Sequence, residues 1–173
     1  MYKYKPERNP RQCLLLVICL SVLSCAGFIA SSYIETYRFL AQLIAVLFLA
    51  MSIMIVIRYT ITEIEYTITA DTFIITKIVG NKMTIVCSLN LASTIALVNK
   101  KTFEQTKEFS NATMRYNYSQ NIKAQSFVYV YLFNGKKGMI EFEPNAIFVK
   151  IMNDAIENAR KNNPETKEIN EKI

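Results

Sequence analysis

With 173 residues and a net charge of +6, the chain has room for one ordinary soluble core and a membrane segment, but hardly for two independent cores. It contains no histidine, so it lacks the commonest general base and the commonest neutral metal ligand, which disfavours the familiar kinds of enzyme. Its four cysteines include no C-x-x-C pair, so neither a disulfide framework nor a zinc site is expected.

Two apolar runs dominate the first third of the chain, one from Cys13 to Ala30 and one from Phe39 to Ile57. The second run has nineteen residues and would form a helix about 28 Å long, close to the roughly 30 Å of hydrocarbon in a bilayer. The alternatives for the first run are an uncleaved signal anchor, a cleaved secretion signal, and a lipoprotein signal ending at Cys25. Apolar sequence continues beyond Cys25, however, and the second run follows after a short loop. We therefore expect a transmembrane helical hairpin over residues 13–58.

The cations that flank these runs predict the orientation of the hairpin in the membrane. Four of them precede the first run: Lys3, Lys5, Arg8 and Arg11. The connecting loop has only Arg38, beside Glu35. Because cytoplasmic flanks of membrane helices are rich in lysine and arginine, residues 1–12 are expected to be a basic cytoplasmic tail. Two crossings return the chain to the same side, so we expect a multi-pass cell-membrane protein with cytoplasmic N- and C-termini.

From residue 59 onward, short β-branched and aromatic runs with period-two alternation predict strands. Ile64, Tyr66 and Ile68 share one strand face, and the pair Gly80-Asn81 predicts a tight turn between two later strands. A fourth strand is expected over residues 93–100, and a fifth around residues 114–118. Residues 126–133 carry bulky side chains on both faces, so this strand should be central or covered.

The pattern changes again after a last hairpin, whose turn is expected over residues 134–138. Pro144 suits the first turn of a helix. Apolar residues then recur every four positions, which predicts an amphipathic helix of about four turns: Ile147, Ile151, Ala155 and Ala159, flanked by Phe148, Met152 and Ile156. Residues 59–161 are thus expected to form one domain, followed by a flexible polar tail over residues 162–173.

Six or seven antiparallel strands closed by one C-terminal helix resemble a pleckstrin-homology-like (PH-like) domain. The chain resembles bacterial PH-like membrane proteins with an N-terminal two-helix transmembrane hairpin. The residues that carry the resemblance are the run from Tyr66 to Thr76, the turn Gly80-Asn81, Leu89-Asn90-Leu91 with Ile95, and Phe142-Glu143-Pro144 before Phe148. The resemblance implies an α+β membrane protein with a PH-like antiparallel β-barrel or sandwich capped by the C-terminal helix. It implies no single activity.

The cations of the soluble part offer candidates for membrane-proximal or binding contacts: Lys100, Lys101, Lys136, Lys137 and Arg58. Near an anionic leaflet each can contribute about 1 kcal/mol; the alternative is that they are solvated residues at strand ends. A strongly electropositive cup for a lipid headgroup is not expected. Residues 59–173 hold 14 basic and 12 acidic residues, a net charge of +2, and the first turn of the domain carries Asp71 and no cation.

Two carboxylate pairs, Glu63 with Glu65 and Glu141 with Glu143, share strand faces and could bind a cation or do acid–base chemistry. Alternating solvent-facing positions explain them as well, and no nucleophile, glycine-rich loop or metal set accompanies them. We therefore expect no catalytic, metal or cofactor site and no enzyme. Nucleic acid is not expected as a partner either, because the tyrosines of residues 126–133 lie in a strand that should be buried.

These observations favour a non-enzymatic, membrane-anchored binding or scaffold module that positions a protein partner at the cytoplasmic leaflet. The expected partners are the lipid bilayer and an unidentified protein, with homo-oligomers possible. The polar segment Thr102–Ala124 is the expected recognition loop. Two alternatives remain: an immunity or envelope-stress protein that protects against membrane-active peptides, or a subunit of a larger membrane complex. For the latter, Ala26-Gly27, Ala41 and Ala45 offer small faces for helix packing.

Overall fold

The computed structural model describes residues 1–106 and 112–162, and the chain divides into two compact units. The helical unit comprises residues 8–62. The sheet unit combines residues 1–7 with the chain from residue 63 onward. Residues 1–12 were expected to be a tail, but residues 1–7 are part of the sheet unit. Most of the expected C-terminal tail, residues 163–173, lies outside the described residues.

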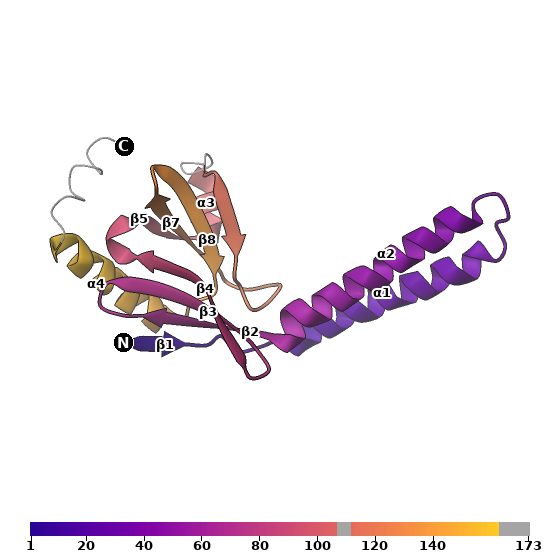
Figure 1. The fold of residues 1–173 in the computed structure, drawn as a ribbon, viewed down its shortest axis with the longest axis horizontal. Helices are drawn as coiled ribbons and strands as arrows, with labels where there is room; N and C mark the ends of the chain where they lie inside the picture. The colour runs from indigo at the N-terminus through magenta and orange to yellow at the C-terminus, as the bar shows by residue number, and fades with distance from the viewer. Residues whose placement is uncertain (107–111, 163–173) are drawn as a thin grey trace. The chain divides into compact units, whose positions relative to one another are not determined.

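The helical unit is a pair of neighbouring helices, α1 (Pro10–Ser31) and α2 (Arg38–Val56) (Figure 1). Pro10 stands at the start of α1, where the missing N–H has no helical partner to lose. A π-helical turn, Ile57–Ile61, prolongs α2, so the strand expected from residue 59 begins at residue 62 instead. Both helices are long and apolar enough to cross a membrane, and only 11% of each apolar window is buried.

Small side chains hold the two helices together. The Cβ atom of an alanine at Gly27 would lie 3.1 Å from the Cβ atom of Ala45, which is completely buried. The Ser24 hydroxyl donates a 2.8 Å hydrogen bond to the Ala45 carbonyl. The small faces expected to contact other helices of a complex are therefore used, at Gly27 and Ala45, to pack α1 against α2.

Sheet A of the sheet unit has the strand order β1-β2-β3-β4. Its strands are β1 (Tyr2–Tyr4), β2 (Thr62–Ile68), β3 (Thr72–Val79) and β4 (Lys82–Asn90). The predicted face of Ile64, Tyr66 and Ile68 is buried, at 3% exposure or less. The predicted turn at Gly80-Asn81 connects β3 to β4, and Gly80 has the positive φ of 58° that favours glycine.

The N-terminal strand β1 was not expected from the sequence. It pairs antiparallel with β2, with Tyr2 opposite Ile68 and Tyr4 opposite Tyr66. The rings of Tyr2 and Tyr4 lie 5.9 Å and 5.8 Å from the ring of Phe148. The sequence Tyr-Lys-Tyr-Lys thus alternates aromatic residues that contact the core with exposed lysines, which is the strand period of two.

Sheet B has the order β5-β7-β8-β6. Its strands are β5 (Thr94–Asn99), β7 (Phe127–Phe133), β8 (Lys136–Phe142) and β6 (Met114–Asn117). The predicted fifth strand is confirmed as β6, but β6 runs parallel to β8, so the expectation of an all-antiparallel domain is wrong at this edge. The two sheets do not close into a barrel, and the two-sheet alternative is the one that the structure has. The predicted central position of residues 126–133 is confirmed, because β7 lies between β5 and β8.

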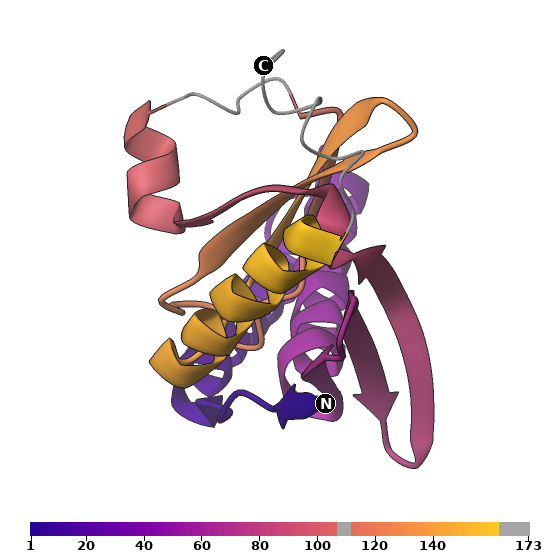
Figure 2. The ribbon, with the colours of Figure 1, turned by 90° about the vertical axis from the view of Figure 1, so that its left-hand side faces the viewer.

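One aromatic core fills the space between the two sheets and α4 (Ala146–Asn162), which lies along them (Figure 2). Tyr66, Phe73, Phe142 and Phe148 are completely buried, with ring centroids 5.2–6.5 Å apart. Asn145 caps α4 by accepting a 2.7 Å hydrogen bond from the Phe148 amide, so Pro144 precedes the helix and does not lie in its first turn. The buried stripe is Phe148, Met152, Ile156 and Ala159; the predicted stripe is wrong at Ile147, which is 61% exposed.

Candidate functional site

The outer face of sheet B carries a second, smaller apolar cluster, formed by Val128, Val130 and Met139. These side chains belong to β7 and β8 and alternate with the tyrosines that enter the main core. Phe103 of α3 (Lys100–Thr106) packs against the cluster from outside. Both faces of β7 are therefore covered in part, which explains why its sequence is apolar on both sides.

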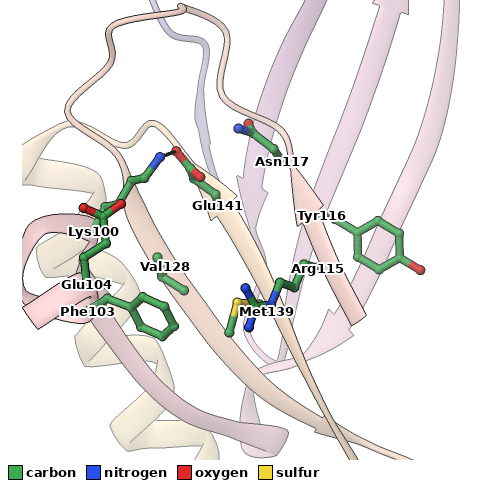
Figure 3. A pocket seen from close by; sticks show the side chains of 9 residues that line it. All are labelled: Lys100, Phe103, Glu104, Arg115, Tyr116, Asn117, Val128, Met139 and Glu141. Carbon is green, nitrogen blue, oxygen red and sulfur yellow. Dashed lines mark hydrogen bonds and ion pairs between the residues drawn. The ribbon is translucent and has the colours of Figure 1, made fainter. Parts of the chain in front are cut away.

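A pocket of about 280 Å³ opens beside this cluster, between α3 and β6. Figure 3 shows Phe103 pointing toward Val128 and Met139, whereas the ring of Tyr116 points away from them. The floor is apolar and the rim carries charges of both signs. The pocket is lined by Lys100, Phe103, Glu104, Arg115, Tyr116, Asn117, Val128, Met139 and Glu141. Of these nine residues, the sequence suggested Lys100 as a binding candidate and Glu141 as a member of a carboxylate pair; the other seven were not singled out as site residues.

An ion pair fixes one end of the pocket. The Lys100 ammonium lies 2.8 Å from Oε1 of Glu141, which also accepts a 2.7 Å hydrogen bond from the Ser126 hydroxyl. The Lys100 amide donates to the Ser126 carbonyl at 3.0 Å. The first residue of α3 is thus tied to the strands beneath it. Lys100 was predicted at a strand end, but it begins a helix, and its charge is balanced by a carboxylate.

The remaining candidate cations lie in separate places. Lys101 is exposed next to Lys100, and its amide donates a 3.0 Å hydrogen bond to the Asn99 side chain. Lys136 and Lys137 begin β8, because the turn is a two-residue one at Asn134 and Gly135, shorter than predicted. Asn99 pairs with Phe127 at one end of β7, whereas Lys136 pairs with Phe133 at the other end. The two lysine pairs therefore lie at opposite ends of sheet B and do not form one patch.

Arg58, the fifth candidate, belongs to the helical unit. It lies in the π-helical turn that ends α2, with its guanidinium carbon 5.7 Å from the centroid of the Tyr59 ring. A cation and an amphipathic ring at the end of an apolar helix are typical of a membrane interface.

Two further cations of the predicted topology set, Arg8 and Arg11, flank the start of α1. The Arg8 guanidinium donates a hydrogen bond to the Thr60 carbonyl at 2.5 Å.

Both predicted carboxylate pairs are engaged in structural contacts. Glu65 lies 3.2 Å from the Lys3 ammonium, and Glu63 forms an ion pair with Lys5. Glu141 pairs with Lys100, as described above. The Glu143 carboxylate accepts hydrogen bonds from Asn121, at 3.0 Å from the backbone amide and 2.8 Å from the side-chain amide. Every carboxylate of the two pairs has a cation or an amide as its partner, and this is typical of structural residues.

The expected recognition loop, Thr102–Ala124, divides into two parts with different roles. Its residues 102–117 supply α3 and β6, which border the pocket, although residues 107–111 lie outside the described residues. Residues 118–121 are instead fastened to the core. The Tyr66 hydroxyl donates to the Tyr118 carbonyl at 2.7 Å, and the Gln120 side chain accepts from the Ile64 amide at 2.9 Å.

Burial keeps the phenols and the thiol of the core in their neutral forms. Burial raises the pKa of Tyr129 to about 12, although a 2.6 Å hydrogen bond with the Thr94 hydroxyl opposes the shift. Burial also raises the pKa of Tyr131 and the pKa of the Cys87 thiol. A half-buried thiol with a raised pKa is a poor nucleophile, so Cys87, which packs against the core, has the character of a packing residue.

The fold can be compared with known proteins. A protein-family model described as "Bacterial PH-like domain (DUF6106)" matches residues 5–161. The chain belongs to this bacterial PH-like family. The matched range includes α1 and α2 as well as most of the sheet unit, and it confirms the resemblance seen in the sequence. Comparisons with curated proteins and with solved structures gave no match. PH-like domains are generally non-catalytic, and membership suggests a binding or scaffold module.

Proposed function

We propose that this bacterial PH-like protein is a non-enzymatic, membrane-anchored module that holds a protein partner at the cytoplasmic leaflet. The observation that carries the binding role is the α3–β6 pocket, with its apolar floor and charged rim. The anchor is the α1–α2 hairpin. Helix length and apolar composition support the anchor, because both helices are long enough to cross a bilayer and only 11% of each apolar window is buried.

The pairing of β1 with β2 supports the proposed topology. Strand β1 precedes α1 in the chain, and β2 follows α2, yet the two strands lie side by side in sheet A. Since one sheet cannot lie on two sides of a membrane, the chain between the strands crosses an even number of times. The cations of the first eleven residues favour the cytoplasmic side for this sheet. Both termini are then cytoplasmic.

The chemistry of the pocket suggests what binds there. Phe103, Val128 and Met139 provide an apolar floor, and around it the rim offers Glu104 and Arg115 as well as the Lys100–Glu141 ion pair. Protein interfaces are organised in this way, with an apolar anchor at the centre and a polar rim around it. The pocket therefore suits one large apolar side chain of a partner protein, whose neighbouring polar groups contact the rim.

A non-enzymatic role agrees with the engagement of the acidic groups described above. The Glu141 carboxylate, which is the one at the pocket, is already shared by Lys100 and Ser126. Within residues 1–106 and 112–162, no group of three histidine, cysteine, aspartate or glutamate side chains is arranged to hold a metal ion. The ion pair and hydrogen bond of the Glu141 carboxylate support a role of the pocket in recognition.

The test is site-specific crosslinking in cells that express the full chain. A photoreactive amino acid in place of the exposed Glu104, at the pocket rim, should form an adduct with a protein of defined mass. Phe103→Ala removes an apolar wall of the pocket and should lower the adduct yield roughly tenfold, as for an anchor contact. The matched control is Phe133→Ala, which removes an equally large ring that is 54% exposed and lies away from the pocket.

The control should leave the yield unchanged. A yield that survives Phe103→Ala, while limited proteolysis shows that both variants remain folded, would refute the pocket as the contact site. A separate Arg115→Trp variant adds bulk at the exposed rim of the pocket, keeps the probe at position 104, and should also lower the adduct yield.

A further inference from the structure

We infer that the tip of the β3–β4 hairpin rests on the surface of an anionic lipid bilayer and orients the sheet unit there. This inference depends on the membrane anchoring proposed above. It assigns lipid contact to a surface other than the lysine pairs of sheet B and other than the pocket.

The direction of the strands fixes where the hairpin tip lies within the sheet unit. Strand β2 begins directly after the helical unit, and β1 ends shortly before it. A tight turn closed by a 2.9 Å hydrogen bond from the Thr69 amide to the Thr72 carbonyl reverses the chain between β2 and β3. Strand β3 therefore runs back toward the end of sheet A at which the chain enters and leaves. The turn at Gly80-Asn81 lies at that end.

Large apolar side chains are exposed on this tip. Met83 is 72% exposed, Ile85 is 64% exposed and Val79 is 39% exposed. Met83 and Ile85 are two residues apart on β4, so they project from the same face of the strand. Strand β4 is also an edge of sheet A. Exposed apolar residues gathered on an edge hairpin mark a contact surface, because water is a poor environment for them.

The charges of the β3–β4 hairpin favour an anionic lipid surface as its partner. Between Thr72 and Asn90 the charged residues are two lysines, Lys77 and Lys82, and there is no aspartate or glutamate. Both lysines are exposed. Apolar side chains flanked by cations suit the boundary between acyl chains and anionic headgroups, where each lysine near the surface contributes attraction.

The chain contains a second hairpin of similar chemistry that serves as a control. The β7–β8 tip carries the exposed Phe133 with Lys136 and Lys137. This tip lies at the end of sheet B that is farther from the points where the chain enters and leaves the sheet unit. The opposite end of β8 leads into Glu143, which binds Asn121, and the Asn121 side chain donates to the Glu7 carbonyl where the chain leaves the sheet unit. The β7–β8 tip therefore points away from the chain exits, and we expect no lipid contact there.

The experiment uses the full chain reconstituted into vesicles of phosphatidylcholine and phosphatidylglycerol. A photoreactive benzoylphenylalanine replaces Leu15, Met83 or Phe133 in three separate preparations, and mass spectrometry identifies what is crosslinked. Leu15 is 68% exposed on α1 and reports on the anchoring itself. We expect lipid adducts at positions 15 and 83 and none at position 133. Lys77→Glu combined with Lys82→Glu should lower the adduct at position 83 roughly fivefold or more, without changing that at position 15.

The three positions test the membrane anchoring and the lipid contact of the β3–β4 hairpin separately. No lipid adduct at position 15 would overturn the anchoring and this inference with it. An adduct at 15 but not at 83 would overturn the inference and leave the anchoring intact. Equal adducts at 83 and 133, or a crosslinked dimer at 83, would also overturn it, because the contact would then be unselective or made with a second copy of the chain.

Discussion

The ammonium of Lys3 lies 3.2 Å from Oε1 of Glu65, which joins a residue ahead of the first apolar helix to one that follows the second. Lys5, which directly follows β1, forms the next ion pair with Glu63 of β2. Cations that the sequence offered as topology signals are thus also structural partners in sheet A. The two roles agree with the proposed topology, in which the N-terminus and the sheet unit lie on the same side of the membrane.

The Lys3–Glu65 pair can be tested by exchanging its charges. Lys3→Glu should lower the free energy of unfolding by up to about 1 kcal/mol, because the Lys3 side chain is 55% exposed and exposed pairs are weak. Glu65→Lys should have a similar effect. The double variant should recover most of the loss, as measured by urea unfolding of the full chain in detergent. Losses that simply add in the double variant would show that the pair contributes nothing.

The buried hydroxyl of Tyr66 should matter more than this surface pair. It donates to the Tyr118 carbonyl at 2.7 Å and accepts from the Glu143 amide at 3.1 Å, so it joins β2 to the residues that follow β6 and β8, two neighbouring strands of sheet B. Tyr66→Phe leaves both partners unsatisfied and should cost about 1–3 kcal/mol. Tyr116→Phe is the control, because its ring is 47% exposed. Equal unfolding midpoints for the two variants would contradict the bridging role of Tyr66.

Gly138 makes room for the Tyr131 ring on the neighbouring strand. The Cβ atom of an alanine at this position would lie 2.5 Å from the ring carbon Cζ of Tyr131, which is 4% exposed and cannot swing freely aside. Gly138→Ala should therefore destabilise the sheet unit by about 1–3 kcal/mol. Combining it with Tyr131→Leu should relieve the overlap, so the two changes together should cost less than the sum of their separate effects. A strictly additive double variant would argue against the contact.

Alkaline pH should destabilise the sheet unit through Tyr129. Its pKa is raised from 10.0 to about 12 by burial, so between these values the unfolded chain loses a proton that the folded chain retains. Stability is therefore unaffected by this group below pH 10 and falls by about 1.4 kcal/mol per pH unit as the pH rises toward 12. Tyr129→Phe lacks the ionisable group and should show a shallower decline over the same range in thermal unfolding. Parallel declines would contradict this assignment.

Several elements could be predicted because their signal is local. The alternation through Ile64, Tyr66 and Ile68 predicted both the strand and the buried face, and the bulk on both sides of residues 126–133 predicted a central strand. Strand β1 was missed although Tyr-Lys-Tyr-Lys alternates in the same way. Three residues are too few for a sequence signal, and β1 depends on β2 and on Phe148 for its stability.

The candidate site was predicted far less well. Lys100 was named, but as a surface cation, and its partner Glu141 was considered only in a carboxylate pair. Phe103 and Met139 are separated by 36 positions in the chain and meet only because α3 packs against the outer face of sheet B. A composition or periodicity argument cannot find such a pocket, since neither residue has a distinctive local pattern.

The sequence by itself determined the two apolar helices, most of the strands and the amphipathic final helix, because each depends on a hydrophobic pattern within about twenty residues. Tertiary structure decided which strands are neighbours. It placed the N-terminal segment beside β2, set β6 parallel to β8, and sent the two lysine pairs to opposite ends of sheet B. The physical reason is that strand pairing joins distant segments, and the burial that selects among the possible pairings exists only when all the partners are in place.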